Sequence, residues 1–316
     1  MIVLTLLGSV CPAAAAAEDA APAAPAPPYD VRPLFDEGRS TRYEVWGKRT
    51  MRMDLQGPFG QRTLTQTMVS EGEVTWKVQR IGDDGSATCE MTLLWMSLTV
   101  QADDGEPRSV DSRDGVDNED AMSVRIGALV EKPIVFEMNA DGSVQSVRGV
   151  DRVREAFGQG AGSDLKDAVF LEQASTLATL PRAPATLDLD GQWSSTNVWS
   201  RNYGNLRGDL QNTMNYRLGG VESVAGIPVA TVTGEAQLGF DPDPDMIPDS
   251  GPQIDVQMTN GRATTQIMFD LQRHEVVGRN DVEKVRIETS IESEQINIST
   301  VMEETTQNQV LRVAEE

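Results

Sequence analysis

Hydrophobic and polar residues alternate with a period of two along much of the chain, most clearly in residues 71–100. Before the Asp-Asp-Gly turn sequence at 83–85, the apolar positions are Val74, Trp76 and Val78. After the turn they are Ala87, Cys89, Met91, Leu93 and Trp95. Such alternation on both sides of an Asp-Gly turn is typical of a β-hairpin. We therefore predict one long hairpin around which the rest of the protein is organised.

The second strand of this hairpin changes phase. Its apolar residues are odd-numbered up to Trp95, whereas Leu94, Met96, Leu98 and Val100 are even-numbered. A one-residue slip moves side chains to the other face of a sheet. A β-bulge between Leu93 and Trp95 would absorb the slip, and a strand buried on both faces would also account for the apolar run. Either arrangement predicts that the sheet curves.

Most of the remaining chain is strand-like, with turn residues between the segments. Further strands are expected at 42–54, 61–70, 109–110, 134–138, 143–147, 193–202, 209–219, 227–238, 262–270, 275–278, 282–291 and 295–302. The predicted fold class is mainly β with two or three short helices. One or more long, curved antiparallel sheets would form an incomplete barrel or a sandwich. Phe136-Glu137-Met138 before Val144 resembles Phe269-Asp270-Leu271 before Val277, which leaves open two similar halves.

Helical spacing interrupts this pattern twice. Met122, Ile126, Leu129 and Val130 lie on one helical face, which predicts a helix at about 118–130 with Asp117 as its N-cap. Residues 151–180 read as a short helix at 151–157 followed by a longer one at 164–180. Prolines at 181 and 184 then mark a boundary. The expected organisation is an N-terminal β half at 29–180 and a C-terminal β half at 185–316, which could together form one domain.

The N-terminal segment predicts export. Residues 2–7 are apolar but too few to span a bilayer, and the alanines before Glu18 suit signal-peptidase cleavage. We therefore expect a signal peptide at 1–17, an Ala/Pro-rich linker at 18–28 and a periplasmic or secreted protein without a transmembrane segment. Lipid anchoring at Cys11 is an alternative, although bulky Val10 stands where a lipoprotein signal needs a small residue.

Composition narrows the classes of partner. The chain has 27 basic and 49 acidic side chains, a net charge of −22. Such a surface repels phosphate backbones, so no nucleic-acid ligand is expected. After cleavage Cys89 is the only cysteine, and its place in the apolar alternation predicts a buried, inert thiol. One cysteine and one histidine cannot build the nitrogen- and sulfur-rich sites that zinc prefers.

No catalytic or cofactor-binding residue can be assigned from the sequence. His274 is the only histidine, and no G-x-S-x-G sequence accompanies it, so we interpret it as a turn residue. A hydrolase built on two carboxylates stays open, because such a pair is set in space and not in sequence.

Calcium is the one metal that the sequence leaves open. Its candidate ligands lie in one acidic loop and are Asp241, Asp243, Asp245 and Asp249. A second acidic group is Asp111, Asp114, Asp117 and Asp120. The loop at 241–251 lacks the glycine and closing glutamate of an EF-hand, so a solvated acidic loop is the alternative. Calcium would imply a surface or structural protein.

Several short segments resemble an exported bacterial family, the domain of unknown function numbered six-two-six-three. They are Leu34-Phe35, Gly38, Arg42-Tyr43, Val74-Thr75-Trp76-Lys77-Val78, Asp84-Gly85-Ser86-Ala87-Thr88, Pro133-Ile134-Val135-Phe136, Gly142-Ser143-Val144, Val147, Gly149 and Val150. The second half departs from the pattern, since His274-Glu275 stand where a turn glycine would be expected. The family has no known activity, so the resemblance implies export and a β-rich fold.

A curved sheet crossed by helices is also similar in architecture to the half-barrels of periplasmic lipoprotein carriers. We therefore expect a non-enzymatic binding or interaction protein with a concave apolar groove. The groove would hold a lipid, a peptide or a protein partner. A carboxylate-based hydrolase and a calcium-dependent protein are the alternatives.

Overall fold

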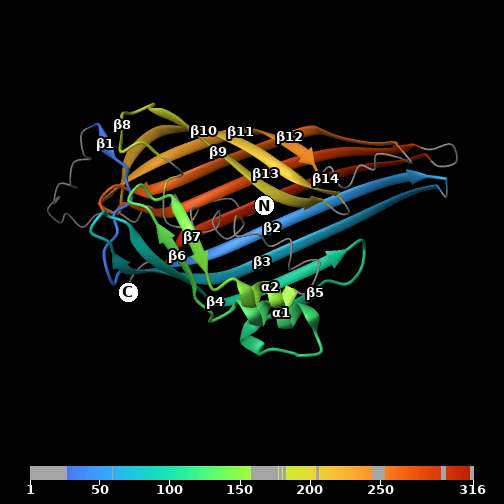
Figure 1. The fold of residues 1–316 in the computed structure, drawn as a ribbon, viewed down its shortest axis with the longest axis horizontal. Coiled ribbons are helices and arrows are strands. Elements are labelled where there is room, and N and C mark those ends of the chain that lie inside the picture. The colour runs from blue at the N-terminus through green and yellow to red at the C-terminus, as the bar shows by residue number, and fades with distance from the viewer. Residues whose placement is uncertain are drawn as a thin grey trace, which may run out of the picture.

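The computed structural model describes residues 27–58, 60–157, 177, 180, 183–203, 206–243, 253–292 and 297–313. Within them the chain forms a 12-stranded antiparallel sheet and a separate two-stranded sheet (Figure 1). The small sheet pairs β1 (Tyr29–Asp30) with β8 (Thr186–Leu187). The predicted signal peptide at 1–17 and most of the linker at 18–28 lie outside the described residues. None of the helices described is long and apolar enough to cross a membrane.

The large sheet has the strand order β7-β6-β4-β3-β2-β14-β13-β12-β11-β10-β9, with β5 added beside β4. Its strands in the first half are β2 (Ser40–Gly57), β3 (Gly60–Ile81), β4 (Ala87–Ala102), β5 (Arg108–Asp111), β6 (Ile134–Met138) and β7 (Val144–Arg148). Those in the second half are β9 (Gln192–Tyr203), β10 (Leu206–Val224), β11 (Ile227–Pro242), β12 (Gln253–Asp270), β13 (Glu275–Glu292) and β14 (Asn297–Arg312). The predicted fold class is confirmed: the sheet is large, antiparallel and not closed into a barrel.

The predicted hairpin is formed by β3 and β4, and a bulge accounts for its phase change. Glu73 pairs with Trp95 and Val74 pairs with Leu93, so Leu94 is the extra residue. Beyond the bulge, Met96, Leu98 and Val100 pair with Gly72, Ser70 and Met68. The bulge therefore keeps the apolar residues on both sides of it on one face of the sheet.

Two predicted boundaries are corrected. Residues 61–70 and the first strand of the hairpin form one strand, β3, because its alternation continues through Ser70 and Glu71 without a turn. Residues 275–278 and 282–291 likewise belong to the single strand β13. Most strands extend beyond their predicted ends, since polar residues at the strand tips still pair along the backbone.

The helices are short. A 3-10 helix, η1, spans Ser112–Asp114, and α1 spans Ala121–Leu129. Asp120, and not the predicted Asp117, is the N-cap of α1, with its Oδ1 accepting from Met122 N–H at 2.8 Å. Asp117 instead closes a preceding turn, accepting from Glu119 N–H. The predicted short helix is confirmed as α2 (Asp151–Phe157), whereas the helix predicted at 164–180 lies outside the described residues except for two leucines.

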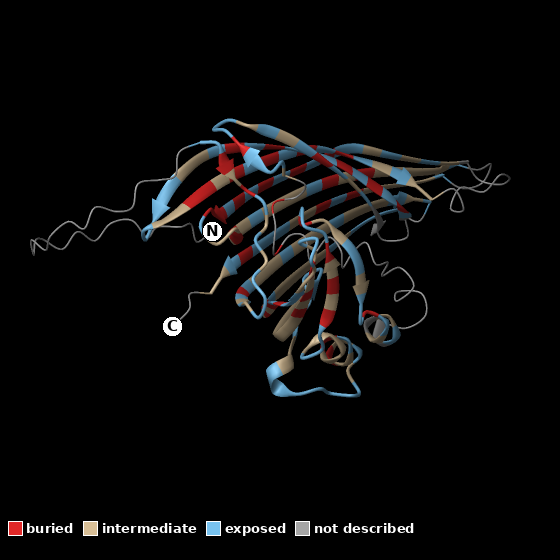
Figure 2. Ribbon diagram, turned by 60° about the vertical axis from the view of Figure 1, so that its left-hand side comes forward, coloured by how far each residue is buried: buried red, intermediate tan, exposed pale blue. Residues whose placement is uncertain are grey.

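The sheet curls strongly, and buried residues alternate with more exposed ones along many of its strands (Figure 2). Inner-face glycines permit this curvature. An added Cβ at Gly72 would lie 2.7 Å from the Trp95 carbonyl oxygen, and at Gly234 it would lie 2.6 Å from Thr265. The two halves meet where β2 pairs with β14 from Tyr43 to Gln56, so one continuous sheet crosses the midpoint of the chain.

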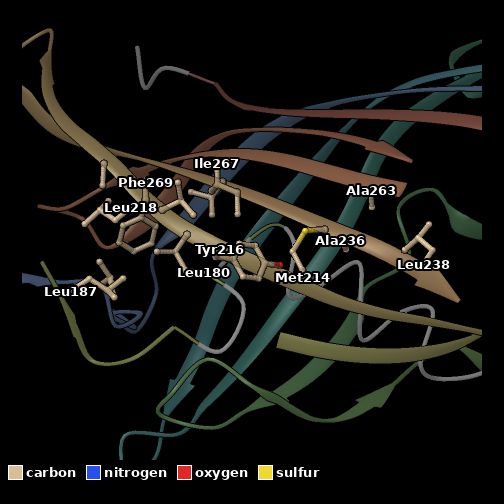
Figure 3. Close-up of a cluster of buried hydrophobic side chains, with 14 of the residues drawn as sticks. Leu180, Leu187, Met214, Tyr216, Leu218, Ala236, Leu238, Ala263, Ile267 and Phe269 are labelled. Atoms are coloured by element: carbon tan, nitrogen blue, oxygen red, sulfur yellow. The ribbon is translucent and has the colours of Figure 1, made fainter. Parts of the chain in front are cut away.

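Two hydrophobic clusters fill the inner face. One joins β10, β11 and β12 with β13 and β14, and Figure 3 shows its side chains, including Leu180, Tyr216 and Phe269. The other joins β3, β4 and β6, with Trp76 stacked on Phe136 at 5.6 Å between ring centroids. The described residues Leu177 and Leu180 are both buried, the first in the β3–β4 cluster and the second in the β10–β12 cluster. Leu177 and Leu180 therefore pack against different halves of the protein.

Candidate functional site

Strand register aligns a row of apolar side chains across five strands of the inner face. Directly paired residues share a face of the sheet. We call the aligned residues the methionine row: Met258, Ile287, Met302, Met53 and Leu64, from β12, β13, β14, β2 and β3. Ile287 and Met302 in the centre are buried, and the three outer members are half-buried. The row is therefore a partly open apolar edge of the cluster that joins β10, β11 and β12 with β13 and β14.

More apolar residues extend this surface toward the β2–β3 turn. Leu55 is the next inner-face residue on β2, and Ile254, Val256, Ile291 and Ile298 lie on the neighbouring strands. All of them are half-buried. Methionine is flexible and polarizable, so a methionine-bearing surface can adapt to ligands of different shape. This part of the inner face could hold a hydrocarbon chain.

A polar belt crosses β2, β14 and β13 on the side of the methionine row that faces away from the β2–β3 turn. Arg49 pairs with Thr306 of β14 across the sheet, and Thr306 pairs with Glu283 of β13. Nη2 of Arg49 donates to Oε2 of Glu304 at 2.6 Å, and the Glu304 side chain is 7% exposed. A carboxylate this buried needs a cation beside it, so the ion pair holds the belt together. An apolar ligand on the methionine row would end against this belt.

A buried charge network lies at the opposite end of the sheet. Asp270 and Glu275 flank the β12–β13 turn, and Arg312 near the end of β14 contacts both carboxylates. Nη1 of Arg312 is 3.2 Å from Oδ2 of Asp270, whose side chain is fully buried. Oδ1 of Asp270 also accepts from the N–H groups of Gln272 and Arg273, both at 2.9 Å. Asp270 therefore stabilises the β12–β13 turn through its backbone N–H groups and neutralises part of the positive charge of Arg312.

The first strand of the large sheet joins the same network. Nη2 of Arg39 lies 2.8 Å from Oε2 of Glu275, and Thr41 Oγ1 donates to that oxygen at 3.1 Å. Burial, and then the negative charge of Glu275, raise the pKa of the neighbouring Tyr43 hydroxyl. Asp270 and Glu275 are both buried carboxylates beside the same arginine. Each is bound to Arg312, and this arrangement joins three strands of the sheet electrostatically.

The hollow beside this network is small. It has a volume of about 30 Å³ and is lined by Leu34, Phe35, Trp76, His274 and other residues. A volume of this size admits one or two water molecules and no lipid chain. His274 occupies the β12–β13 turn with a positive φ of 55°, and its Nδ1 lies 2.7 Å from the Arg32 carbonyl oxygen. The histidine thus helps to hold the N-terminal segment against the turn.

Two of the four candidate calcium ligands, Asp241 and Asp243, belong to the residues that the structure describes. Asp243 pairs with Arg207, whose Nε donates to Oδ2 at 2.8 Å, and Asp241 pairs across the strands with Asp209. Asp245 and Asp249 lie outside the described residues. In the first acidic group, Asp111 caps η1 and Asp120 caps α1. Among the described residues, no three His, Cys, Asp or Glu side chains are placed to hold a metal ion.

Cys89 is fully buried on the inner face of β4. Burial, and then the charge of Glu137, raise the pKa of its thiol to about 12. The thiolate is the reactive form of cysteine, so this side chain serves packing.

Sequence reasoning placed most members of the methionine row in separate predicted strands and did not bring them together. Their alignment depends on register between strands that are up to about 250 residues apart in sequence, as for the paired Met53 and Met302. The charge network was missed for the same reason. One local signal for the apolar surface was present in the sequence. Met51 and Met53 stand two residues apart in one predicted strand, so their side chains lie on the same face of the sheet.

Comparison with solved structures finds distant similarity to several β proteins. A lipovitellin structure shares 8% identity with a TM-score of 0.48, covering 89% of this chain and 26% of the lipovitellin chain. This chain therefore spans about a quarter of the length of lipovitellin. An outer membrane channel from Pseudomonas putida shares 6% identity with a TM-score of 0.24, covering 92% of this chain and 100% of the channel. A DUF1329 family protein from Desulfovibrio piger shares 9% identity with a TM-score of 0.15 and 83% coverage of both chains.

All three TM-scores are below 0.5, so the ligands of these proteins carry no argument about the ligand of this chain. No curated protein sequence matches the chain. The model of the Family of unknown function (DUF6263) matches residues 84–177, which confirms the resemblance over that part of the chain.

Proposed function

We propose that the protein is an exported, non-enzymatic binding protein that holds the apolar part of a lipid on the inner face of its curved sheet. The observation that carries the proposal is the methionine row, a partly open apolar surface aligned across five strands. Burial of such a surface by a ligand is favourable by roughly 25 cal/mol per Å². The apolar segment and alanine-rich stretch at the N-terminus support export.

A lipid fits this surface better than a peptide or a folded protein. A peptide bound there would bury backbone N–H and C=O groups against hydrocarbon and thioether side chains, which cannot satisfy them. A folded protein would need a broad, flat contact area, whereas the inner face is curled (Figure 2). A flexible hydrocarbon chain needs neither hydrogen-bond partners nor a flat surface.

The proposal is tested with a variant pair on neighbouring residues of β3. Leu64 belongs to the methionine row, and Thr65 is exposed on the opposite face. The uncharged fluorophore N-phenyl-1-naphthylamine serves as the apolar probe. We expect Leu64→Gln to weaken its binding about fivefold, because part of a leucine's contribution of about 1.5–3 kcal/mol is lost. Thr65→Gln should bind the probe as the unchanged protein does.

Equal probe binding by the two variants would refute the proposed site. Circular dichroism controls for folding. Native mass spectrometry of the purified protein gives an independent readout, in which a co-purified lipid mass should be present in the Thr65→Gln variant and depleted in the Leu64→Gln variant.

A further inference from the structure

We infer, resting on the proposed function, that the ligand is a long-chain carboxylic acid whose carboxylate pairs with Arg62. Arg62 pairs with Leu55 across the β2–β3 hairpin, and Leu64, the next inner-face residue of β3, pairs with Met53. The guanidinium group therefore originates on the same face as the methionine row, one position closer to the open end of the sheet.

Arg62 lines a hollow at that end of the sheet. The hollow has a volume of about 260 Å³, and its walls include Leu55, Pro58 and Ile298. This volume is near the lower end of the range for small-molecule sites. An apolar hollow with one convergent charged group is the arrangement expected for an amphiphile, because the apolar walls hold the chain and the charge orients the end group.

Arg62 differs from the other arginines of the inner face in its pairing. Arg49 is bound to Glu304, and Arg279 is bound to Asp281 at 2.7 Å. The Arg62 side chain is exposed and makes no ion pair or side-chain hydrogen bond with the residues that the structure describes. A guanidinium binds a carboxylate in a bidentate manner, so an anionic end group would supply the partner that the chain itself does not.

Charge and length restrict the occupant further. The protein carries a net charge of −22, and among the described residues on this part of the inner face Arg62 is the one cation without an ion pair, which favours an anion with a single charge. From Arg62 to Met68, which pairs with Arg49 of the polar belt, β3 advances six residues, about 20 Å at ~3.3 Å per residue. The acyl chains of one leaflet fill about half of a ~30 Å hydrocarbon core, so one long chain fits this distance.

The experiment compares two 16-carbon ligands that differ in charge. Hexadecanoate and hexadecanol displace N-phenyl-1-naphthylamine from the unchanged protein, from Arg62→Gln and from Arg80→Gln. Arg80 is a matched control, because it is an exposed arginine near the other end of β3. We expect the unchanged protein and Arg80→Gln to prefer hexadecanoate about fivefold, the scale of an exposed ion pair, and Arg62→Gln to bind both ligands equally.

The outcomes separate the two proposals. Equal binding of both ligands by the unchanged protein, or a preference that survives in Arg62→Gln, overturns the inference and leaves the lipid-binding function standing. Displacement by neither ligand, together with no binding of the fluorophore, overturns both. Tighter binding of dihexadecanoyl phosphatidylglycerol than of hexadecanoate would replace the single-chain acid by a two-chain phospholipid and overturn the assignment.

Discussion

Replacement of Arg312 by methionine tests whether the buried charge network stabilises the fold. Methionine has a similar length and no charge, so Arg312→Met removes the cation that contacts both Asp270 and Glu275 while keeping an apolar side chain in place. Asp270 would keep its two backbone donors, and Glu275 would keep Arg39 and Thr41. The two carboxylates would then repel one another in a site from which water is largely excluded.

The structure sets the expected size of this effect. The side chains of Arg312, Asp270 and Glu275 are 15%, 0% and 9% exposed. Removing one partner of a buried ion pair costs about 3–5 kcal/mol, a large part of the ~5–15 kcal/mol by which a domain is usually stable. With an m value of about 3 kcal/mol per M urea, the unfolding midpoint should fall by about 1 M or more.

Urea unfolding followed by tryptophan fluorescence measures this shift. Arg286→Met is the matched control, because Arg286 also lies between two carboxylates, Glu288 and Glu303. Those three side chains are 40%, 44% and 51% exposed, so the control should lose about 1 kcal/mol or less. Equal midpoints for the two variants would refute the argument that burial makes the Arg312 network strong.

The double variant Arg312→Met with Asp270→Asn extends the test. If the two residues act through their mutual ion pair, the double variant should lose about 1–3 kcal/mol less than the two single variants together. Strict additivity would show that Arg312 acts on stability without Asp270.

Three further predictions concern single residues. Cys89, in a Cys11→Ser chain, should not react with a thiol reagent at pH 8 until urea unfolds the protein, because burial raises its pKa to about 12; rapid reaction of the folded protein would contradict this. The Arg113 side chain and N–H lower the pKa of Asp111 to about 2, so its carboxylate should titrate near that pH by NMR, and Arg113→Gln should raise the midpoint. Because the folded pKa lies below the ordinary 3.8, the stabilisation by Asp111 is present above pH 3.8 and is lost as the pH falls toward 2. Deletion of Met96 should lower the thermal unfolding midpoint far more than deletion of Leu94, because Leu94 is the unpaired bulge residue and its loss keeps Trp95 opposite Glu73, whereas loss of Met96 shifts Leu98 and Val100 to the opposite face.

The local pattern of the sequence was enough to predict the fold class and several elements. Period-two alternation located the β3–β4 hairpin, and its phase change located the bulge at Leu94. Alternation is a local property, because successive side chains of a strand must point to opposite faces. The same locality explains an error: the cap of α1 is Asp120 and not Asp117, since several aspartates precede the helix and the hydrophobic face does not select among them.

The binding surface and the charge network were decided only by tertiary structure. Met258, Met302 and Met53 share a row because β12, β13, β14 and β2 pair in one register, and Arg312 meets Asp270 because β14 ends beside the β12–β13 turn. The sequence by itself determined that the chain forms long antiparallel strands and a curved sheet. It did not determine which side chains meet, because pairing between distant strands depends on the free energy of the whole sheet and not on the period of any one strand.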